Sequence, residues 1–163
     1  MFLKPDYNLK NIYDIDLNEL KNSGIKALLF DLDSTLMASK SGVYTEKTIE
    51  FLNNAKKLFF VAVVSNNKNP EYKKKVSAIS DFPLLFEACK PKTFKVRRFL
   101  HDYGLVPENC ILVGDRPLTD ILCGKNLGCK TILVDSITAD TEARIVRFVR
   151  WLERLSIRYQ SKD

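Results

Sequence analysis

Short runs of hydrophobic residues alternate with longer amphipathic stretches along most of the chain, beginning at residue 25. The short runs predict strands, and because they show little polar alternation they are typical of strands with helices over both faces. These predicted strands lie at 25–31, 58–65, 83–88, 110–115 and 130–135. Apolar residues at helical spacing predict the helices between them, at 45–58, 69–79, 92–104 and 117–128.

The regular alternation of strands and helices predicts an α/β fold. We expect a Rossmann-like three-layer sandwich with a central, mainly parallel five-stranded sheet. With 163 residues, of which 45% are hydrophobic, the chain suffices for one domain, residues 1–163. Residues 1–24 are expected to form a helical lead-in that ends at Gly24, and residues 139–159 a basic amphipathic helix.

Composition and charge exclude several classes of protein. The N-terminus lacks the apolar core of a signal peptide, and the longest hydrophobic run, LFFVAVV, is too short to cross a bilayer. We therefore expect a cytoplasmic location, or a peripheral one at the inner face of a membrane. The four cysteines form no CxxC pair, which favours buried thiols over disulfides or zinc. The net charge of +6 is spread along the chain and does not indicate nucleic-acid binding.

Polar residues follow the predicted strands at the edge where ligands bind in such folds. Two unit charges about 4 Å apart repel by roughly 4 kcal/mol at an effective dielectric near 20, so clustered carboxylates need a cation. Oxygen ligands favour Mg²⁺, which Asp115 would anchor while Asp120 orients its surroundings. The residues expected to meet at this edge are Asp31, Asp33, Ser65, Asn66, Lys90, Asp115 and Asp120.

The chemistry that suits these residues is phosphoryl transfer to a carboxylate. An aspartate can attack phosphorus without a base because it is already ionised at neutral pH, and Asp31 is the candidate nucleophile. Asp33 would protonate the leaving alkoxide and then deprotonate the hydrolytic water. Lys90 would neutralise the phosphoryl oxygens, to which Ser65, Asn66 and backbone amides would also bind.

Four segments, LLFDLDSTL, FVAVVSNN, KP and ILVGDRPLTD, resemble in order and spacing the motifs of the haloacid dehalogenase (HAD) superfamily of phosphohydrolases. The lead-in and the tail GKNLGCKTILVD are similar to the compact, capless class III phosphatases of the YqeG type. That family includes the mitochondrial and plastid phosphatidylglycerophosphate phosphatases. The resemblance implies a magnesium-dependent phosphatase that forms an aspartyl-phosphate intermediate.

The same resemblance implies which atoms hold the metal. They are the side chain of Asp31, the backbone carbonyl of Asp33 and the side chain of Asp115. For the lysine of the third motif, the KP pair favours Lys90, with Lys92 as the alternative.

The predicted substrate follows from what the chain has room for. Only 31 residues separate Asp33 from Ser65, too few for a cap domain, so the open site suits a bulky substrate or a lipid headgroup. Arginines repeat at helical spacing in the predicted helix 139–159, where they would either face water or contact anionic phospholipid. Phosphatidylglycerophosphate is therefore the leading candidate, and a sugar phosphate or a nucleic-acid end is the alternative.

Two hypotheses without catalysis also account for some of these features. A phosphoryl-accepting switch would use a strand-end aspartate, magnesium and a lysine, but it needs no acid at Asp33. A basic RNA-binding scaffold would bind RNA with a steep salt dependence, and it would lose nothing when Asp31 becomes Asn.

Overall fold

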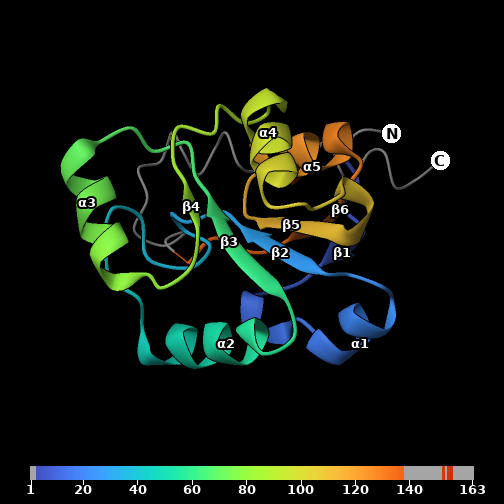
Figure 1. The fold of residues 1–163 in the computed structure, drawn as a ribbon, viewed down its shortest axis with the longest axis horizontal. Helices are drawn as coiled ribbons and strands as arrows, with labels where there is room; N and C mark the ends of the chain where they lie inside the picture. Colours follow the sequence, from blue (N-terminus) through green and yellow to red (C-terminus); the bar gives the residue numbers. More distant parts are fainter. Residues whose placement is uncertain (1–2, 138–151, 153, 156–163) are drawn as a thin grey trace.

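The computed structural model describes residues 3–137, 152, 154 and 155, which contain a six-stranded sheet with every neighbouring pair of strands parallel (Figure 1). The strand order is β1-β6-β5-β2-β3-β4. The predicted α/β fold with a parallel sheet is therefore confirmed. The strands are β1 (Tyr7–Asn8), β2 (Ala27–Phe30), β3 (Phe60–Val64), β4 (Leu84–Leu85), β5 (Cys110–Gly114) and β6 (Lys130–Leu133).

Helices cover both faces of this sheet. Figure 1 shows α4 and α5 over one face and α1 and α2 over the other. The α-helices are α1 (Leu17–Asn22), α2 (Glu46–Lys56), α3 (Pro70–Ile79), α4 (Phe94–Asp102) and α5 (Leu122–Leu127). Shorter helical turns are η1 (Ile12–Asp14), η2 (Pro107–Asn109) and the π-helical turn η3 (Pro117–Ile121).

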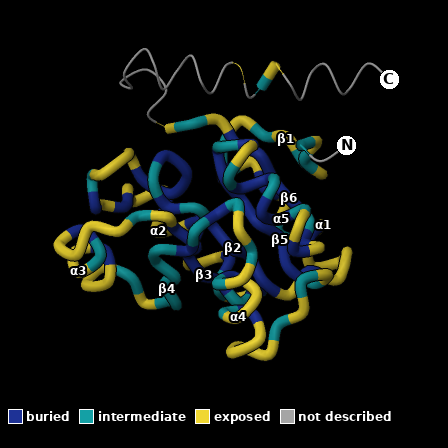
Figure 2. Tube along the Cα trace, turned by 90° about the horizontal axis from the view of Figure 1, so that it is seen from above, coloured by how far each residue is buried: buried dark blue, intermediate teal, exposed yellow. Residues whose placement is uncertain are grey.

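The core consists of two layers that the central strands separate. Successive side chains of a strand point to opposite faces, so in β2 Leu28 and Phe30 pack in one layer and Ala27 and Leu29 in the other. All four are fully buried, which explains why the sequence here shows no polar alternation. Figure 2 shows the buried residues concentrated along β2, β3 and β5, whereas exposed residues lie on the surrounding helices and loops.

The predicted number of strands, five, is wrong, because the lead-in contributes a sixth. Strand β1 pairs with β6 at the sheet edge, where the Asp6 N–H donates to Thr131 O (3.1 Å) and the Leu9 N–H to Leu133 O (2.9 Å). The strand has only two residues and no hydrophobic run, so periodicity gave no signal for it. The expected helix is present as α1, between β1 and β2.

Two helix ends follow from local sequence. Asn69 caps α3, because its side-chain oxygen accepts a hydrogen bond from the Tyr72 N–H (2.9 Å), and Pro70 occupies the first helical position. Helix α5 ends at Gly128, whose φ of +91° lies in the left-handed region that glycine tolerates best.

The chain has no cap domain between its first two central strands. Residues 31–59, all of them described, hold one loop and the helix α2. No inserted domain between β2 and β3 therefore covers the carboxyl end of β2, as the short spacing between Asp33 and Ser65 predicted.

The helix predicted at 139–159 lies outside the described residues, apart from Leu152, Arg154 and Leu155. Of these, Arg154 pairs with Asp135 (2.9 Å) and donates a hydrogen bond to Val134 O (3.1 Å). Among the residues that the structure describes, no helix has the length and apolar character needed to cross a bilayer.

Candidate active site

Strand pairing brings together Asp31, which follows β2, and Asp115, which follows β5. Strand β2 pairs in parallel with β5, and the Asp31 N–H donates to Val113 O (2.8 Å), so Asp31 and Asp115 leave adjacent strands at the same edge. Asp120 returns to this edge from η3. Carboxylate oxygens of Asp31, Asp115 and Asp120 all lie within 4.8 Å of one another. Three carboxylates this close form a candidate site for a divalent cation.

Lys90 lies within this group of acids. Its Nζ is 2.7 Å from Asp31 Oδ1 and 2.7 Å from Asp120 Oδ1. The side chain of Lys90 is 1% exposed and that of Asp31 is 14% exposed, so solvent can reach the aspartate but hardly the lysine. Lys92, the alternative lysine, is exposed and makes no contact with these acids.

Burial and the neighbouring charges shift the pKa values of this pair. Burial raises the pKa of Asp31 to about 6, although the Lys90 ammonium acts in the opposite direction. Burial alone would lower the pKa of Lys90, but the carboxylates of Asp120 and Asp31 outweigh it and raise that pKa above its usual value. Lys90 is therefore a permanent cation that partly balances the clustered acids.

Asn66 holds Lys90 in place. Its side-chain oxygen accepts from the Lys90 N–H (2.7 Å), and its side-chain nitrogen donates to Lys90 O (2.8 Å). Both ends of the amide are therefore bonded to the backbone of Lys90, a contact that the sequence did not predict, and the binding of substrate by Asn66 stays a prediction. Asn66 and Lys90 are 24 residues apart and meet only in the folded chain.

The carboxylate of Asp33 has different hydrogen-bond partners from that of Asp31. Its Oδ1 accepts from the Tyr72 hydroxyl (2.7 Å) and from the Lys40 N–H (2.8 Å), and its Oδ2 accepts from Asn67 Nδ2 (3.2 Å). Tyr72 and Lys40 were not predicted, because they lie 39 and 7 residues from Asp33 in segments without a recognisable motif. These three donors fix the orientation of Asp33 beside the acid cluster.

Ser65 and Asp120 are both buried and both accept hydrogen bonds from nearby backbone N–H groups. Ser65 is buried just after β3, and its hydroxyl accepts a hydrogen bond from the Asn67 N–H (3.1 Å). Asp120 packs against Gly114, where any Cβ would collide with its carboxylate. Its Oδ2 accepts from the Arg116 N–H (3.1 Å), so Asp120 is tied to both Lys90 and the loop after β5. The glycine of the sequence ILVGD is thus required by the packing of Asp120.

The fold is that of the HAD hydrolases. A family model described as HAD-hydrolase-like matches residues 87–146. A HAD family enzyme from Bacteroides thetaiotaomicron, solved with magnesium and inorganic phosphate, superposes with a TM-score of 0.54 at 15% identity, covering 77% of this chain and 100% of that one. A HAD phosphatase from Thermococcus onnurineus gives 0.53 at 12% identity, covering 73% and 89%. These likenesses establish the shared fold.

Sequence relatives define the family more narrowly. The Bacillus subtilis (strain 168) protein named Probable phosphatase YqeG is 33% identical over 153 residues, which cover 94% of this chain and 88% of that protein. The chain belongs to this YqeG family of phosphatases within the HAD superfamily. The chloroplastic/mitochondrial phosphatidylglycerophosphate phosphatase 1 of Arabidopsis thaliana is 31% identical over 161 residues, 93% of this chain but 46% of that protein. These relatives favour a phosphatase over the two hypotheses without catalysis.

Proposed function

We propose that this protein is a magnesium-dependent phosphatase that forms an aspartyl phosphate on Asp31, and that phosphatidylglycerophosphate is its substrate. The observation that carries the proposal is the position of Asp31: a partly accessible carboxylate, 2.7 Å from a buried lysine, at an open edge of the sheet. A nucleophile must be reachable by its substrate, and Asp31 is the most accessible member of the Asp31–Lys90–Asp120 group.

The donor set suits magnesium. Every candidate ligand is a carboxylate oxygen, and hard oxygen ligands are those that Mg²⁺ prefers. Asp31 and Asp115 would hold the ion, together with the Asp33 backbone carbonyl that the HAD resemblance implies. Asp120 already bonds to Lys90 and to the Arg116 N–H, so its role is to fix these neighbours. When bound, the ion would supply positive charge to the phosphoryl oxygens.

The reaction then proceeds in two displacements at phosphorus. A carboxylate oxygen of Asp31 forms a bond to phosphorus as the ester P–O bond breaks, and Asp33 gives its proton to the departing alkoxide. Asp33 next removes a proton from water, whose oxygen attacks phosphorus, releasing inorganic phosphate and restoring Asp31. Lys90 stabilises the charge on the phosphoryl oxygens in both transition states. With a pKa of about 6, Asp31 is mostly ionised at neutral pH, as its role requires.

The substrate assignment rests on the named relative and on the uncapped edge of the sheet. A relative that covers 93% of this chain is named for phosphatidylglycerophosphate. Because the segment between β2 and β3 holds no cap, a substrate attached to a membrane could approach Asp31 directly.

A comparison of substrates tests this assignment. Phosphatidylglycerophosphate in detergent micelles should be hydrolysed with a kcat/KM at least about tenfold above those of small sugar phosphates, because no cap closes over a small substrate to hold it at Asp31. Release of inorganic phosphate measures both. A faster reaction with sugar phosphates would remove the lipid assignment and leave the phosphatase.

Magnesium should stabilise the protein through Asp115. We expect Mg²⁺ to raise the Tm of the wild type and to raise that of Asp115→Ala much less, because a ligand that binds only the folded state stabilises it by an amount that grows with its affinity. Thermal unfolding with and without the ion measures both shifts. Asp102→Asn, an exposed acid at the end of α4, should keep the full shift. Equal shifts in wild type and Asp115→Ala would place the ion elsewhere.

A further inference from the structure

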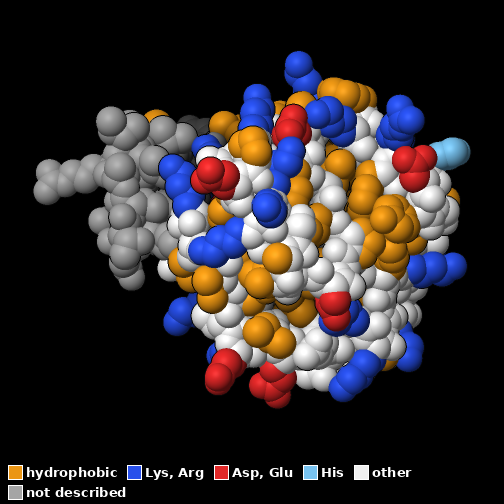
Figure 3. All heavy atoms as spheres, turned by 60° about the vertical axis from the view of Figure 1, so that its left-hand side comes forward, with side chains coloured by type: hydrophobic (Ala, Val, Ile, Leu, Met, Phe, Trp, Pro, Cys, Tyr) orange, Lys and Arg blue, Asp and Glu red, His pale blue; other side chains and the backbone are white. Residues whose placement is uncertain are grey.

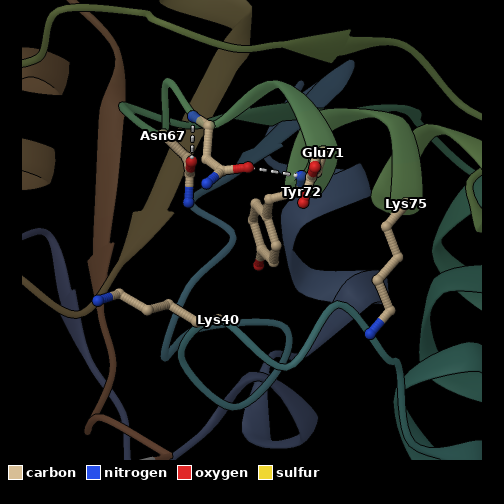
Figure 4. A pocket seen from close by; sticks show the side chains of 6 residues that line it. Lys40, Asn67, Glu71, Tyr72 and Lys75 are labelled. Atoms are coloured by element: carbon tan, nitrogen blue, oxygen red, sulfur yellow. Dashed lines mark hydrogen bonds between the residues drawn. The ribbon is translucent and has the colours of Figure 1, made fainter.

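A pocket of 540 Å³ lies between the loop that carries Lys40 and the N-terminal part of α3 (Figure 4). Three of its lining residues, Lys40, Asn67 and Tyr72, are the ones that donate hydrogen bonds to the Asp33 carboxylate. The pocket therefore borders the group that protonates the leaving alkoxide. Its lining residues are Lys40, Asn67, Asn69, Glu71, Tyr72 and Lys75.

The position of the pocket next to the residues that hold Asp33 suits the leaving group of the substrate. If Asp33 protonates the leaving oxygen, as proposed above, the rest of the leaving group must extend from that oxygen past Asp33. This pocket offers space there, since three of its six lining residues are the ones that hold Asp33. Each of its six lining residues carries a polar or charged group, so the pocket offers hydrogen-bond and ionic partners to a hydrophilic group.

The charges of the pocket favour an anion. Lys40 and Lys75 are exposed, and in Figure 4 they lie on either side of Tyr72. Within residues 3–137 neither ammonium forms an ion pair; that of Lys75 donates to Ser41 O (2.8 Å). Glu71 is the one acid in the lining, so the two lysines leave the pocket a net positive charge.

Two features of the backbone agree with this charge. Lys40 has a φ of +58°, in the left-handed region that glycine adopts more readily. A lysine at this position therefore costs conformational free energy that a glycine would not. The N-terminus of the ten-residue helix α3 also adjoins the pocket through Asn69 and Glu71, and the partial positive charge of a helix N-terminus favours anions. Figure 3 shows lysines and arginines spread over the face that comes forward from the α3 side of Figure 1.

We propose that this pocket is a subsite for the leaving group, in which Lys40 and Lys75 bind a second phosphate of the substrate, present as a phosphodiester. The proposal rests on the proposed function and narrows it. Substrates would carry a phosphomonoester to be hydrolysed and a phosphodiester to be recognised. A sugar monophosphate lacks the second anion and would leave both lysines without an ionic partner, which gives the enzyme a physical basis for discrimination.

The test uses two soluble substrates, so that membrane binding plays no part. Glycerol 3-phosphate carries only the monoester, whereas deacylated phosphatidylglycerophosphate carries the monoester and the diester. For Lys40→Gln/Lys75→Gln, the ratio of kcat/KM for the second substrate to that for the first should fall about tenfold, mainly through KM, because two ion pairs to the diester are lost. Glutamine keeps the backbone N–H that holds Asp33. Lys74→Gln, an exposed lysine on α3 outside the pocket, should leave the ratio unchanged.

A binding experiment separates failure of this subsite from failure of the catalytic assignment. Calorimetry of deacylated phosphatidylglycerophosphate with Asp31→Asn should show a Kd that weakens about tenfold when both lysines are also replaced. Loss of that difference, or an unchanged specificity ratio, would overturn the subsite even if the enzyme is a phosphatase. If the wild type showed no turnover while the Kd of Asp31→Asn still depended on the two lysines, the subsite would be supported and the catalytic assignment alone refuted.

Discussion

Asp31→Asn is expected to lower kcat for p-nitrophenyl phosphate by at least about a thousandfold, because the amide has the shape of the carboxylate but cannot attack phosphorus. The fold should be intact, since Lys90 keeps its contact with Asp120, 2.7 Å away. Initial rates of nitrophenol release measure the effect, and circular dichroism checks the fold. Asp14→Asn, an exposed aspartate in η1, is the matched control and should retain full activity. Activity near that of the wild type in Asp31→Asn would exclude Asp31 as the nucleophile.

The same variant should be more stable than the wild type when no metal is present. Burial raises the pKa of Asp31 from 3.8 to about 6, so the folded state binds this proton more tightly than the unfolded state does. Stability of the wild type therefore falls as pH rises from about 4 to about 6, and Asp31→Asn lacks this loss. Urea unfolding in EDTA should show a gain at pH 7 that shrinks toward pH 4. A gain independent of pH would mean that ionisation of Asp31 is not its cause.

Lys90→Met is the second large effect that we expect. The substitution leaves the carboxylates of Asp31 and Asp120 without the ammonium that contacts both, and breaking a buried ion pair costs about 3–5 kcal/mol. Activity should fall as well, by about a hundredfold or more, because the cation beside the phosphoryl oxygens is lost. Urea unfolding and p-nitrophenyl phosphate hydrolysis measure the two effects.

Lys92→Met is the matched control for this substitution. Lys92 is exposed and two residues away, so its replacement should change neither stability nor activity appreciably. If the two variants lost stability equally, the contacts of Lys90 with the acids would not be what stabilises this loop. Equal loss of activity would assign the third motif to Lys92.

The acid cluster was predictable because two of its members, Asp31 and Asp115, directly follow hydrophobic strands. Asp31 and Asp115 each follow a fully buried strand, and parallel pairing then makes them neighbours. The contacts of Asp33 were not predictable in the same way. Its shortest hydrogen bond, 2.7 Å, comes from the Tyr72 hydroxyl on α3. Nothing in the sequence distinguishes this tyrosine from an ordinary core residue. The role of Asn66 also depends on a loop that sequence spacing cannot place beside β3.

By itself, the sequence determined the alternation of strands and helices, the parallel sheet and the strand-end acids that meet beside it, because burial and strand-end position leave local marks in the chain. Tertiary structure alone decided the pairing of β1 with β6, the two hydrogen bonds of Asn66 to the Lys90 backbone and the contact of Tyr72 with Asp33. Each of these joins segments far apart in the chain through hydrogen bonds between polar groups. Such bonds depend on distance and direction in the folded molecule, for which hydrophobic periodicity carries no information.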